Sequence, residues 1–192
     1  MDLFSGIGAF HLALRSFDYK CVLASDIDKY SCETYKTNFG IDSYKDVRKL
    51  EEKDIQDYDI LCTWFPCQSF SVAGFRKGFE DKTRGTLFFE ICRILKQKKP
   101  KYLLLENVKQ LVKHNNEETY KIIIQSLKEL GYIVPKEPLI LSQTQFGIPQ
   151  DRQRVFIPAI HKDYYNKKYI EIDIPQTDIY SILDKKLIKS II

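Results

Sequence analysis

The segment Asp2-Leu3-Phe4-Ser5-Gly6-Ile7-Gly8-Ala9-Phe10 indicates how this chain folds. Its first residues, Asp2–Ser5, form a short apolar run that predicts a strand, and a helical pattern follows near His11–Phe17. Gly6 and Gly8 lie between the two, where missing side chains let a ligand approach the backbone. A nicotinamide-binding fingerprint needs a third glycine three residues later, where His11 stands, so a dehydrogenase is disfavoured.

The same alternation of apolar runs and helical patterns continues along the chain. The run Cys21–Ala24 precedes a predicted helix over Asp28–Phe39. A helical stripe from Leu87 to Leu95 precedes the predicted strand Tyr102–Leu105, and a second stripe spans Tyr120–Leu130. This order predicts an α/β fold, with a mostly parallel sheet and helices on both of its faces.

Composition limits the class of protein. The 192 residues are 44% hydrophobic and 29% charged, which predicts one globular domain with a sizeable core. A net charge of +4 permits nucleic-acid binding without arguing for it. The five cysteines include no Cys-x-x-Cys pair, so we expect neither a disulfide framework nor a metal site, and a reducing compartment. No segment is apolar for long enough to predict a signal peptide or a membrane span.

Three apolar runs begin or end at side chains that can do chemistry. The run Asp59–Trp64 leads into Phe65-Pro66-Cys67-Gln68, which presents a thiol on a polar loop. Tyr102–Leu105 ends at Glu106, and Gln150–Arg154 leads into the next apolar run. A single cysteine is more often a small buried hydrophobe, so the role of Cys67 depends on these neighbours.

Together these segments resemble the cytosine-C5 DNA methyltransferases, in particular those of bacterial restriction-modification systems. The resemblance is carried by Asp2–Phe10, Phe65–Gln68, Glu106-Asn107-Val108 and Gln150–Phe156, which occur in the family's order and at its spacings. It implies a Rossmann-like methyltransferase fold that uses S-adenosyl-L-methionine. It also implies double-stranded DNA as the substrate and a cytoplasmic enzyme encoded by a bacterium or a phage.

The resemblance assigns a cofactor site to the first third of the chain. From its spacing alone, Asp26 can accept hydrogen bonds from two ribose hydroxyls, although it can also be the N-cap of the helix after Asp28. In the family this acid binds the ribose, the next residue, here Ile27, packs on adenine, and the acid at Asp46 takes the adenine amino group. The predicted cofactor-binding residues are Phe4, Ser5, Gly6, Ile7, Gly8, Phe10, Asp26, Ile27, Asp46, Val47, Pro66 and Leu87.

The resemblance also implies how the reaction proceeds. Cytosine C5 is a poor nucleophile until a thiolate, here that of Cys67, adds at C6. A buried Glu106 would hold its proton and bond the ring N3 and the exocyclic amine. By resemblance, Arg154 bonds the cytosine O2 and Arg152 lies near the cysteine; the alternative for each arginine is a salt bridge at a strand start. Methyl transfer to C5, loss of the C5 proton and elimination of Cys67 complete the reaction.

A base inside a duplex must be flipped out before it can reach such a site. Residues 69–86 combine glycines with basic side chains and are predicted to form a mobile loop that closes over DNA. The alternative is a merely flexible surface loop. The predicted nucleic-acid contacts are Gln68, Ser69, Ser71, Arg76, Lys77 and Arg84.

Two features depart from the family. Trp64, the only tryptophan, stands where the family usually has glycine, so we expect its indole to crowd the site and Trp64→Gly to raise methyl transfer. The alternative is that the indole points into the opposite layer and matters only for packing. Residues 1–192 also resemble only an incomplete catalytic domain, without target-recognition domain or C-terminal closing segment. We therefore expect a fragment, or a subunit whose recognition part is on a second chain.

Two other functions remain open from the sequence. A eukaryotic branch of the same family modifies tRNA with similar motifs. A degenerate module that binds S-adenosylmethionine or nucleic acid without turnover is also consistent with Trp64 and the missing parts.

Overall fold

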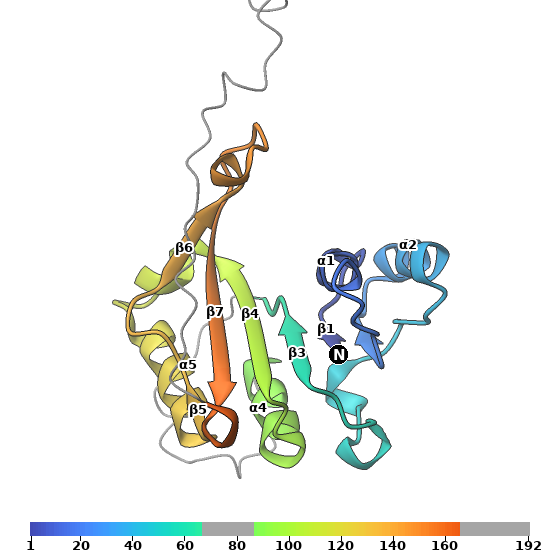
Figure 1. Ribbon diagram of the computed structural model, residues 1–192, viewed down its shortest axis with the longest axis horizontal. Coiled ribbons are helices and arrows are strands. Elements are labelled where there is room, and N and C mark those ends of the chain that lie inside the picture. Colours follow the sequence, from blue (N-terminus) through green and yellow to red (C-terminus); the bar gives the residue numbers. More distant parts are fainter. Residues whose placement is uncertain (67–86, 166–192) are drawn as a thin grey trace, which may run out of the picture.

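The computed structural model describes residues 1–66 and 87–165, which form a mixed sheet flanked by helices (Figure 1). The strand order is β2-β1-β3-β4-β7-β5, with β6 paired to β7. The strands are β1 (Asp2–Leu3), β2 (Ala24–Ser25), β3 (Ile60–Thr63), β4 (Tyr102–Val108), β5 (Tyr132–Ile133), β6 (Leu139–Ser142) and β7 (Gln153–His161). β2, β1, β3 and β4 are parallel, and β7 runs antiparallel to β4, β5 and β6. The predicted, mostly parallel sheet is thus confirmed, with an antiparallel group at one side.

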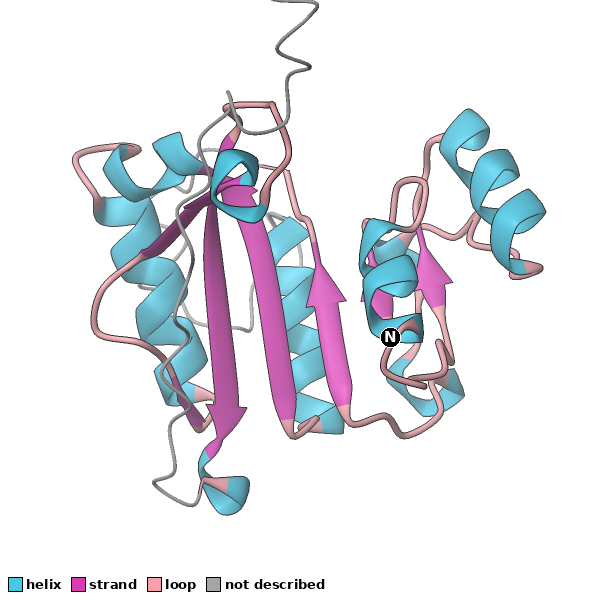
Figure 2. Cartoon of the chain, turned by 45° about the horizontal axis from the view of Figure 1, so that its top comes forward, coloured by secondary structure: helices cyan, strands magenta, loops and turns pink. Residues whose placement is uncertain are grey.

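The helices cover the two faces of the sheet unequally (Figure 2). They are α1 (Ala9–Arg15), α2 (Lys29–Phe39), α4 (Leu87–Lys98) and α5 (Glu118–Glu129), with short 3-10 turns η1 (Val47–Lys49), η2 (Glu52–Asp54), η4 (Lys109–Lys113), η5 (Gln143–Phe146) and η6 (Lys162–Tyr164). α4 and α5 place Ile91 and Ile123 in one core with Leu103 and Leu105 of β4. α1 lies against the other face, where its Phe10 and His11 border a small cavity beside Asp2 and Cys62.

Helix ends follow the local signals in the sequence. Asp28 caps α2, since its carboxylate accepts from the Ser31 N–H at 2.7 Å. After α5, Gly131 has a φ of 91°, the left-handed conformation typical of glycine just past a helix. Gly8 caps α1 with a φ of 95°, and a Cβ there would lie 2.3 Å from the ring of Phe39. Only glycine therefore fits at position 8 without a shift of that ring.

The first two predicted strands are shorter than expected. β1 ends at Leu3 because Phe4 has a φ of 53° and leaves the extended conformation. β2 comprises Ala24–Ser25 instead of Cys21–Ala24, since only those residues lie opposite β1. α1 begins two residues before the predicted His11. These shifts place the Phe4–Gly8 turn at the carboxyl edge of the parallel strands.

Candidate active site

Four side chains form a row across the upper edge of the sheet. The register pairs Leu3 with Thr63 and Thr63 with Leu105. One residue further on, Trp64 follows Thr63 beside Glu106, and its N–H donates to the carbonyl of Leu3, the residue before Phe4. Glu106 is paired with Phe156 of β7. Because side chains alternate along strands and Leu105 belongs to the α4 and α5 core, Trp64 and Glu106 lie on the opposite face, which carries α1, whereas Phe4 also packs against the core.

This row borders a cavity of about 450 Å³. Its wall combines residues predicted for the cofactor with residues predicted for catalysis, which come from β1, α1, β3, β4, β6, η5 and β7. The lining residues are Phe4, Ser5, Ala9, Phe10, Trp64, Glu106, Leu141, Ser142, Gln143, Phe146, Arg152, Arg154 and Phe156. The fold thus brings Glu106, Arg152 and Arg154 together with Phe4, Ser5 and Phe10, as the sequence predicts.

Glu106 and Arg154 form an ion pair at this cavity. Glu106 Oε1 accepts from Arg154 Nε at 2.9 Å, and the two side chains are mostly buried. Glu106 Oε2 is also buried and has no hydrogen-bond partner within the described residues. Burial raises the pKa of Glu106, although the positive charges of Arg154 and Arg152 oppose the shift. The condition on which the prediction for Glu106 depends, burial of its carboxyl group, is therefore met, and its role in catalysis stays a prediction.

The two arginines differ in their surroundings. Arg154 matches the predicted alternative of a salt bridge at a strand start, and its Nη1 also donates to the Gln153 carbonyl at 3.0 Å. Arg152 is exposed, and its guanidinium forms no salt bridge within residues 1–66 and 87–165. Arg152 is thus the more available of the two cations for an anionic group that enters the cavity.

Asn107 connects the end of β4 to the end of β3. Its side chain is buried, and Nδ2 donates to the Phe65 carbonyl at 2.8 Å while Oδ1 accepts from the Val108 N–H. The ring of Phe65 packs against Phe88 of α4, with centroids 5.5 Å apart. Phe65 is therefore anchored through both ring and carbonyl. In the sequence, Asn107 stands out only as part of the Glu106-Asn107-Val108 motif, and the signal for its structural role is a polar residue in an otherwise apolar strand.

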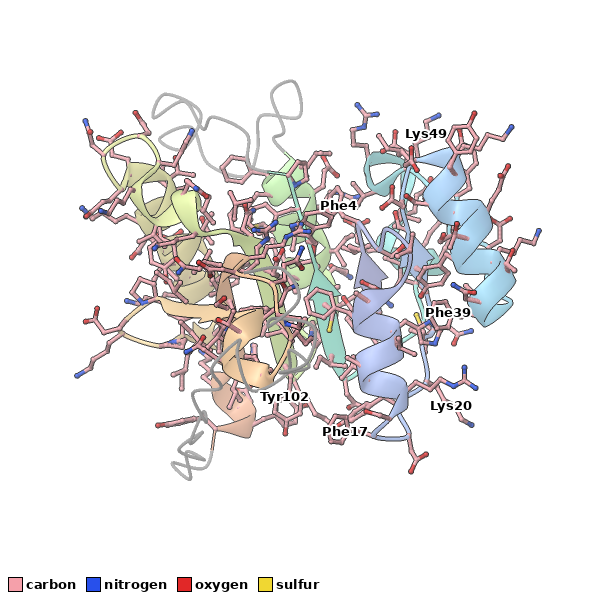
Figure 3. All side chains as sticks on the ribbon, turned by 90° about the horizontal axis from the view of Figure 1, so that it is seen from above. Phe4, Phe17, Lys20, Phe39, Lys49 and Tyr102 are labelled. Atoms are coloured by element: carbon pink, nitrogen blue, oxygen red, sulfur yellow. The ribbon has the colours of Figure 1, made fainter. Side chains whose placement is uncertain are left out.

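A second cavity of about 530 Å³ lies near the turn that follows β1. It is lined by Asp26, Ile27, Tyr44, Lys45, Asp46, Arg48, Lys49 and Leu50. The backbone N–H of Gly6 donates to Asp26 Oδ2 at 2.8 Å. Because Phe4 and Ser5 line the first cavity and Asp26 lines the second, this hydrogen bond connects the walls of the two cavities. Figure 3 looks down on this edge and shows Phe4 near its centre, with Lys49 on the side of α2.

Asp26 and Asp46 have different surroundings in this second cavity. Asp26 accepts from the N–H groups of Gly6 and Asp28, and it is not the N-cap of α2, so that alternative is wrong. Asp46 accepts from the backbone N–H of Arg48 and pairs with its guanidinium at 2.6 Å. The hydrogen bonds from Arg48 lower the pKa of Asp46 and keep it ionised.

The remaining predicted cofactor residues lie outside the two cavity walls. Val47 is buried in the core, and Leu87, at the start of α4, packs against the same core. Ile7 and Pro66 are exposed to solvent. The predicted residues Cys67, Gln68, Ser69, Ser71, Arg76, Lys77 and Arg84 lie outside the described residues.

Trp64 lines the first cavity and is 45% exposed. The alternative that its indole points into the opposite layer is therefore wrong. Its backbone N–H donates to the Leu3 carbonyl at 3.3 Å, which holds it beside β1. The prediction that its removal raises methyl transfer stays a prediction.

The described residues show neither a membrane-spanning helix nor a cluster of metal-binding side chains. None of the helices in residues 1–66 and 87–165 is both long and apolar enough to cross a bilayer. The same residues contain no group of three or more His, Cys, Asp or Glu side chains placed to hold a metal ion.

Comparison with known proteins identifies the family to which the chain is similar. A sequence profile described as C-5 cytosine-specific DNA methylase matches residues 1–192. The chain is 44% identical to the type II methyltransferase M.HhaI of Haemophilus parahaemolyticus, over 85% of this chain and 49% of that protein. It is 47% identical to the type II methyltransferase M.HpaII of Haemophilus parainfluenzae, over 84% of this chain and 46% of that protein. The chain thus spans about half the length of the curated relatives it matches.

The fold comparison agrees with the sequence comparison. A mutant DNMT2 of Spodoptera frugiperda superimposes with a TM-score of 0.70 at 26% identity, covering 93% of this chain and 54% of that one. The predicted Rossmann-like methyltransferase fold is therefore confirmed.

Proposed function

This chain belongs to the C-5 cytosine-specific DNA methylase family, and we propose that it carries the catalytic centre of an enzyme that methylates C5 of cytosine in double-stranded DNA. The observation that supports this function best is the buried Glu106, whose free Oε2 lines a cavity shared with predicted cofactor residues. The names of the relatives at 44% and 47% identity favour DNA over the tRNA alternative and an enzyme over a degenerate module.

The cavities fit S-adenosyl-L-methionine. Asp26 offers carboxylate oxygens at the rim of the second cavity for the ribose hydroxyls, and the exposed Ile27 offers an apolar surface for the adenine. The Ser5 hydroxyl lines the first cavity, is buried, and has no hydrogen-bond partner within the described residues. When bound, this cofactor supplies an electrophilic methyl group on a sulfonium. Asp26, Ile27, Asp46 and Ser5 are the residues we assign to hold it.

Glu106 and Arg154 are placed to act on one pyrimidine at the same time. Their Nε to Oε1 bond aligns the carboxyl and the guanidinium side by side, and Oε2 remains available. In our proposal, protonated Glu106 donates to the ring N3, and a free N–H of Arg154 donates to O2. The raised pKa of Glu106 favours the protonated form that this step needs.

Cys67 follows the anchored Phe65 by two residues in the sequence, and we assign it as the nucleophile. Its thiolate adds to cytosine C6, and the electron pair that appears at C5 would attack the methyl group while the bond from that methyl to the sulfonium sulfur breaks and leaves a neutral thioether. Loss of the C5 proton to a base then lets the C6–S bond break, which restores the ring and frees the thiolate. Glu106 neutralises the charge that builds up on N3 during addition.

The test uses duplex DNA with 5-fluorocytosine, which has no C5 proton to lose and therefore stops the reaction at the adduct. The protein is incubated with this DNA and S-adenosylmethionine, and a denaturation-resistant complex is measured. We expect an adduct with the unaltered protein and with the control Cys21→Ser, and none with Cys67→Ser. An adduct with tRNA alone would move the substrate to RNA. No adduct with either nucleic acid would overturn the proposal.

Two further assignments belong to this proposal. The basic residues Arg76, Lys77 and Arg84, with the polar Gln68, Ser69 and Ser71, are assigned to the DNA backbone, and the reaction to the cytoplasm of a bacterium or a phage host. A second chain with the recognition domain was also predicted. The comparisons give that second chain no support, and the proposed chemistry does not depend on it.

A further inference from the structure

Trp64 occupies a central position in the row across the sheet edge. The end of β1, which leads into the turn that contacts Asp26 through Gly6, lies on one side of it, and Glu106 of β4 lies on the other. We call the part of this edge formed by β1, β2 and α1 the cofactor half, and the part formed by β4 and β7 the base half. In the proposed reaction a methyl group passes from the cofactor half to the base half. The indole therefore stands beside the path of the transferred group.

The surroundings of Trp64 keep its ring in the cavity. Thr63 and Phe65, its sequence neighbours, are buried on the α4 side, so alternation along the strand directs Trp64 to the opposite face. Its backbone is held by the Leu3 carbonyl. With the ring in place the cavity still measures about 450 Å³, so the indole forms a wall and does not fill the space.

The wall around Trp64 is unusually aromatic. Phe4, Phe10, Phe146 and Phe156 line the same cavity. The face of an aromatic ring attracts a cation, and tryptophan does so most strongly. Two positive charges line the same cavity: Arg154 is hydrogen-bonded to Glu106, and Arg152 is exposed, so that solvent screens its charge. The part of the cavity next to Trp64 is thus suited to a positively charged group that has little hydrogen-bonding capacity.

A sulfonium is such a group, whereas the thioether that remains after methyl transfer is neutral. On the basis of the proposed function, we infer that Trp64 determines cofactor specificity: its indole binds the sulfonium of S-adenosylmethionine in preference to the neutral sulfur of S-adenosylhomocysteine. S-adenosylhomocysteine, which remains after the methyl group has been transferred, would then bind less tightly and leave the site more readily.

The test measures dissociation constants, not turnover. Binding of S-adenosylmethionine and S-adenosylhomocysteine to the unaltered protein, Trp64→Phe and Trp64→Leu is followed by calorimetry. In Trp64→Leu we expect the preference for S-adenosylmethionine, written as the ratio of the two dissociation constants, to fall by about 2- to 30-fold. Trp64→Phe, which keeps an aromatic face, should retain most of the preference. Leu141→Ala, which removes a non-aromatic side chain from the same cavity wall, serves as the matched control and should leave the ratio unchanged.

A third ligand separates charge from shape. A cofactor analogue with a protonated amine in place of the methylsulfonium should lose affinity for Trp64→Leu as S-adenosylmethionine does. An unchanged ratio in Trp64→Leu, or equal weakening of all three ligands, would overturn the inference and leave only a packing role. If the unaltered protein binds neither natural ligand, the proposed function fails first, which is a distinguishable result. Thermal unfolding of each variant checks that the fold is retained.

Discussion

The two halves of the sheet edge are built differently. In the cofactor half, β1 and β2 have two residues each, and no residue of α1 is buried within the part of the chain that the structure describes. In the base half, β4 has seven residues and β7 has nine, and α4 and α5 bury five residues each. Hydrophobic packing thus fixes Glu106 and Arg154, whereas the cofactor half depends on other contacts.

Those other contacts are polar and largely involve the backbone. The Ser5 N–H donates to the Ser25 carbonyl at 3.1 Å, the Gly6 N–H to Asp26, and the Ser25 hydroxyl to the Lys45 carbonyl at 2.7 Å. The net contribution of one hydrogen bond to the free energy of unfolding is smaller than that of one large, fully buried apolar side chain. We therefore expect the cofactor half to open more easily than the base half, and a bound cofactor to stabilise it.

The largest effect is expected in the base half, where the geometry is most rigid. Glu106→Gln keeps the size of the side chain but removes the acid, so kcat should fall by about 10² to 10⁴-fold. The affinity for S-adenosylmethionine, measured by calorimetry, should stay the same because Glu106 is assigned to the base. A parallel loss of cofactor affinity would show that the two halves are not separate.

Asp2 is a buried acid in the cofactor half, and it makes that half sensitive to pH. Burial, with a smaller contribution from Asp26, raises its pKa from 3.8 to about 7, against the lowering effects of the Met1 amine and the His11 backbone N–H. An acid whose pKa is higher in the folded than in the unfolded protein contributes most to stability when the pH lies below its pKa in the unfolded protein. This contribution is lost as the pH rises through its pKa in the folded protein. The free energy of unfolding should therefore fall between about pH 4 and pH 7, by at most about 4 kcal/mol.

Urea unfolding at a series of pH values measures this effect. Asp2→Asn should remove most of the pH dependence, because the amide has no proton to lose in this range. Glu106→Gln provides a comparison, because the pKa of Glu106 is also raised by burial. Its titration therefore also lowers the free energy of unfolding as the pH rises. An unaltered slope in Asp2→Asn would mean that another group is responsible.

Asn107 tests the link between the two halves. Asn107→Ala leaves the Phe65 carbonyl buried without its donor, so the free energy of unfolding should fall by about 1–3 kcal/mol. We expect kcat to fall more than the affinity for S-adenosylmethionine, because Phe65 leads into the segment with the assigned nucleophile. Asn107→Asp restores the size but not the donor, and rescue by this variant would argue against the hydrogen bond.

The smallest effect is expected at the rim of the cofactor half. The guanidinium of Arg48 is largely exposed, and exposed ion pairs contribute little. Arg48→Ala should leave the melting temperature unchanged within error and change the dissociation constant of S-adenosylmethionine by less than about threefold. A larger gain in affinity would show that Arg48 competes with the cofactor for Asp46.

Much of the fold was predictable because its signals are local. The cap at Asp28, the glycine after α5 and the stripes of α4 and α5 each depend on residues within one or two turns. The short β1 and β2 were not predictable, because their ends depend on the left-handed Phe4 and on how few residues pair between them. Motif resemblance brought Glu106, Arg152 and Arg154 into one predicted site, and the fold places them around one cavity.

The sequence by itself determined the α/β order, the helical stripes of α4 and α5 and the chemical identity of the residues at the strand ends. Only the tertiary structure decided that Trp64 faces the cavity, that Arg154 pairs with Glu106, and that Asn107 reaches Phe65 across 42 positions. The physical reason is that periodicity and capping act between near neighbours along the chain. Strand register, which no local pattern specifies here, sets which distant side chains share one face of the sheet.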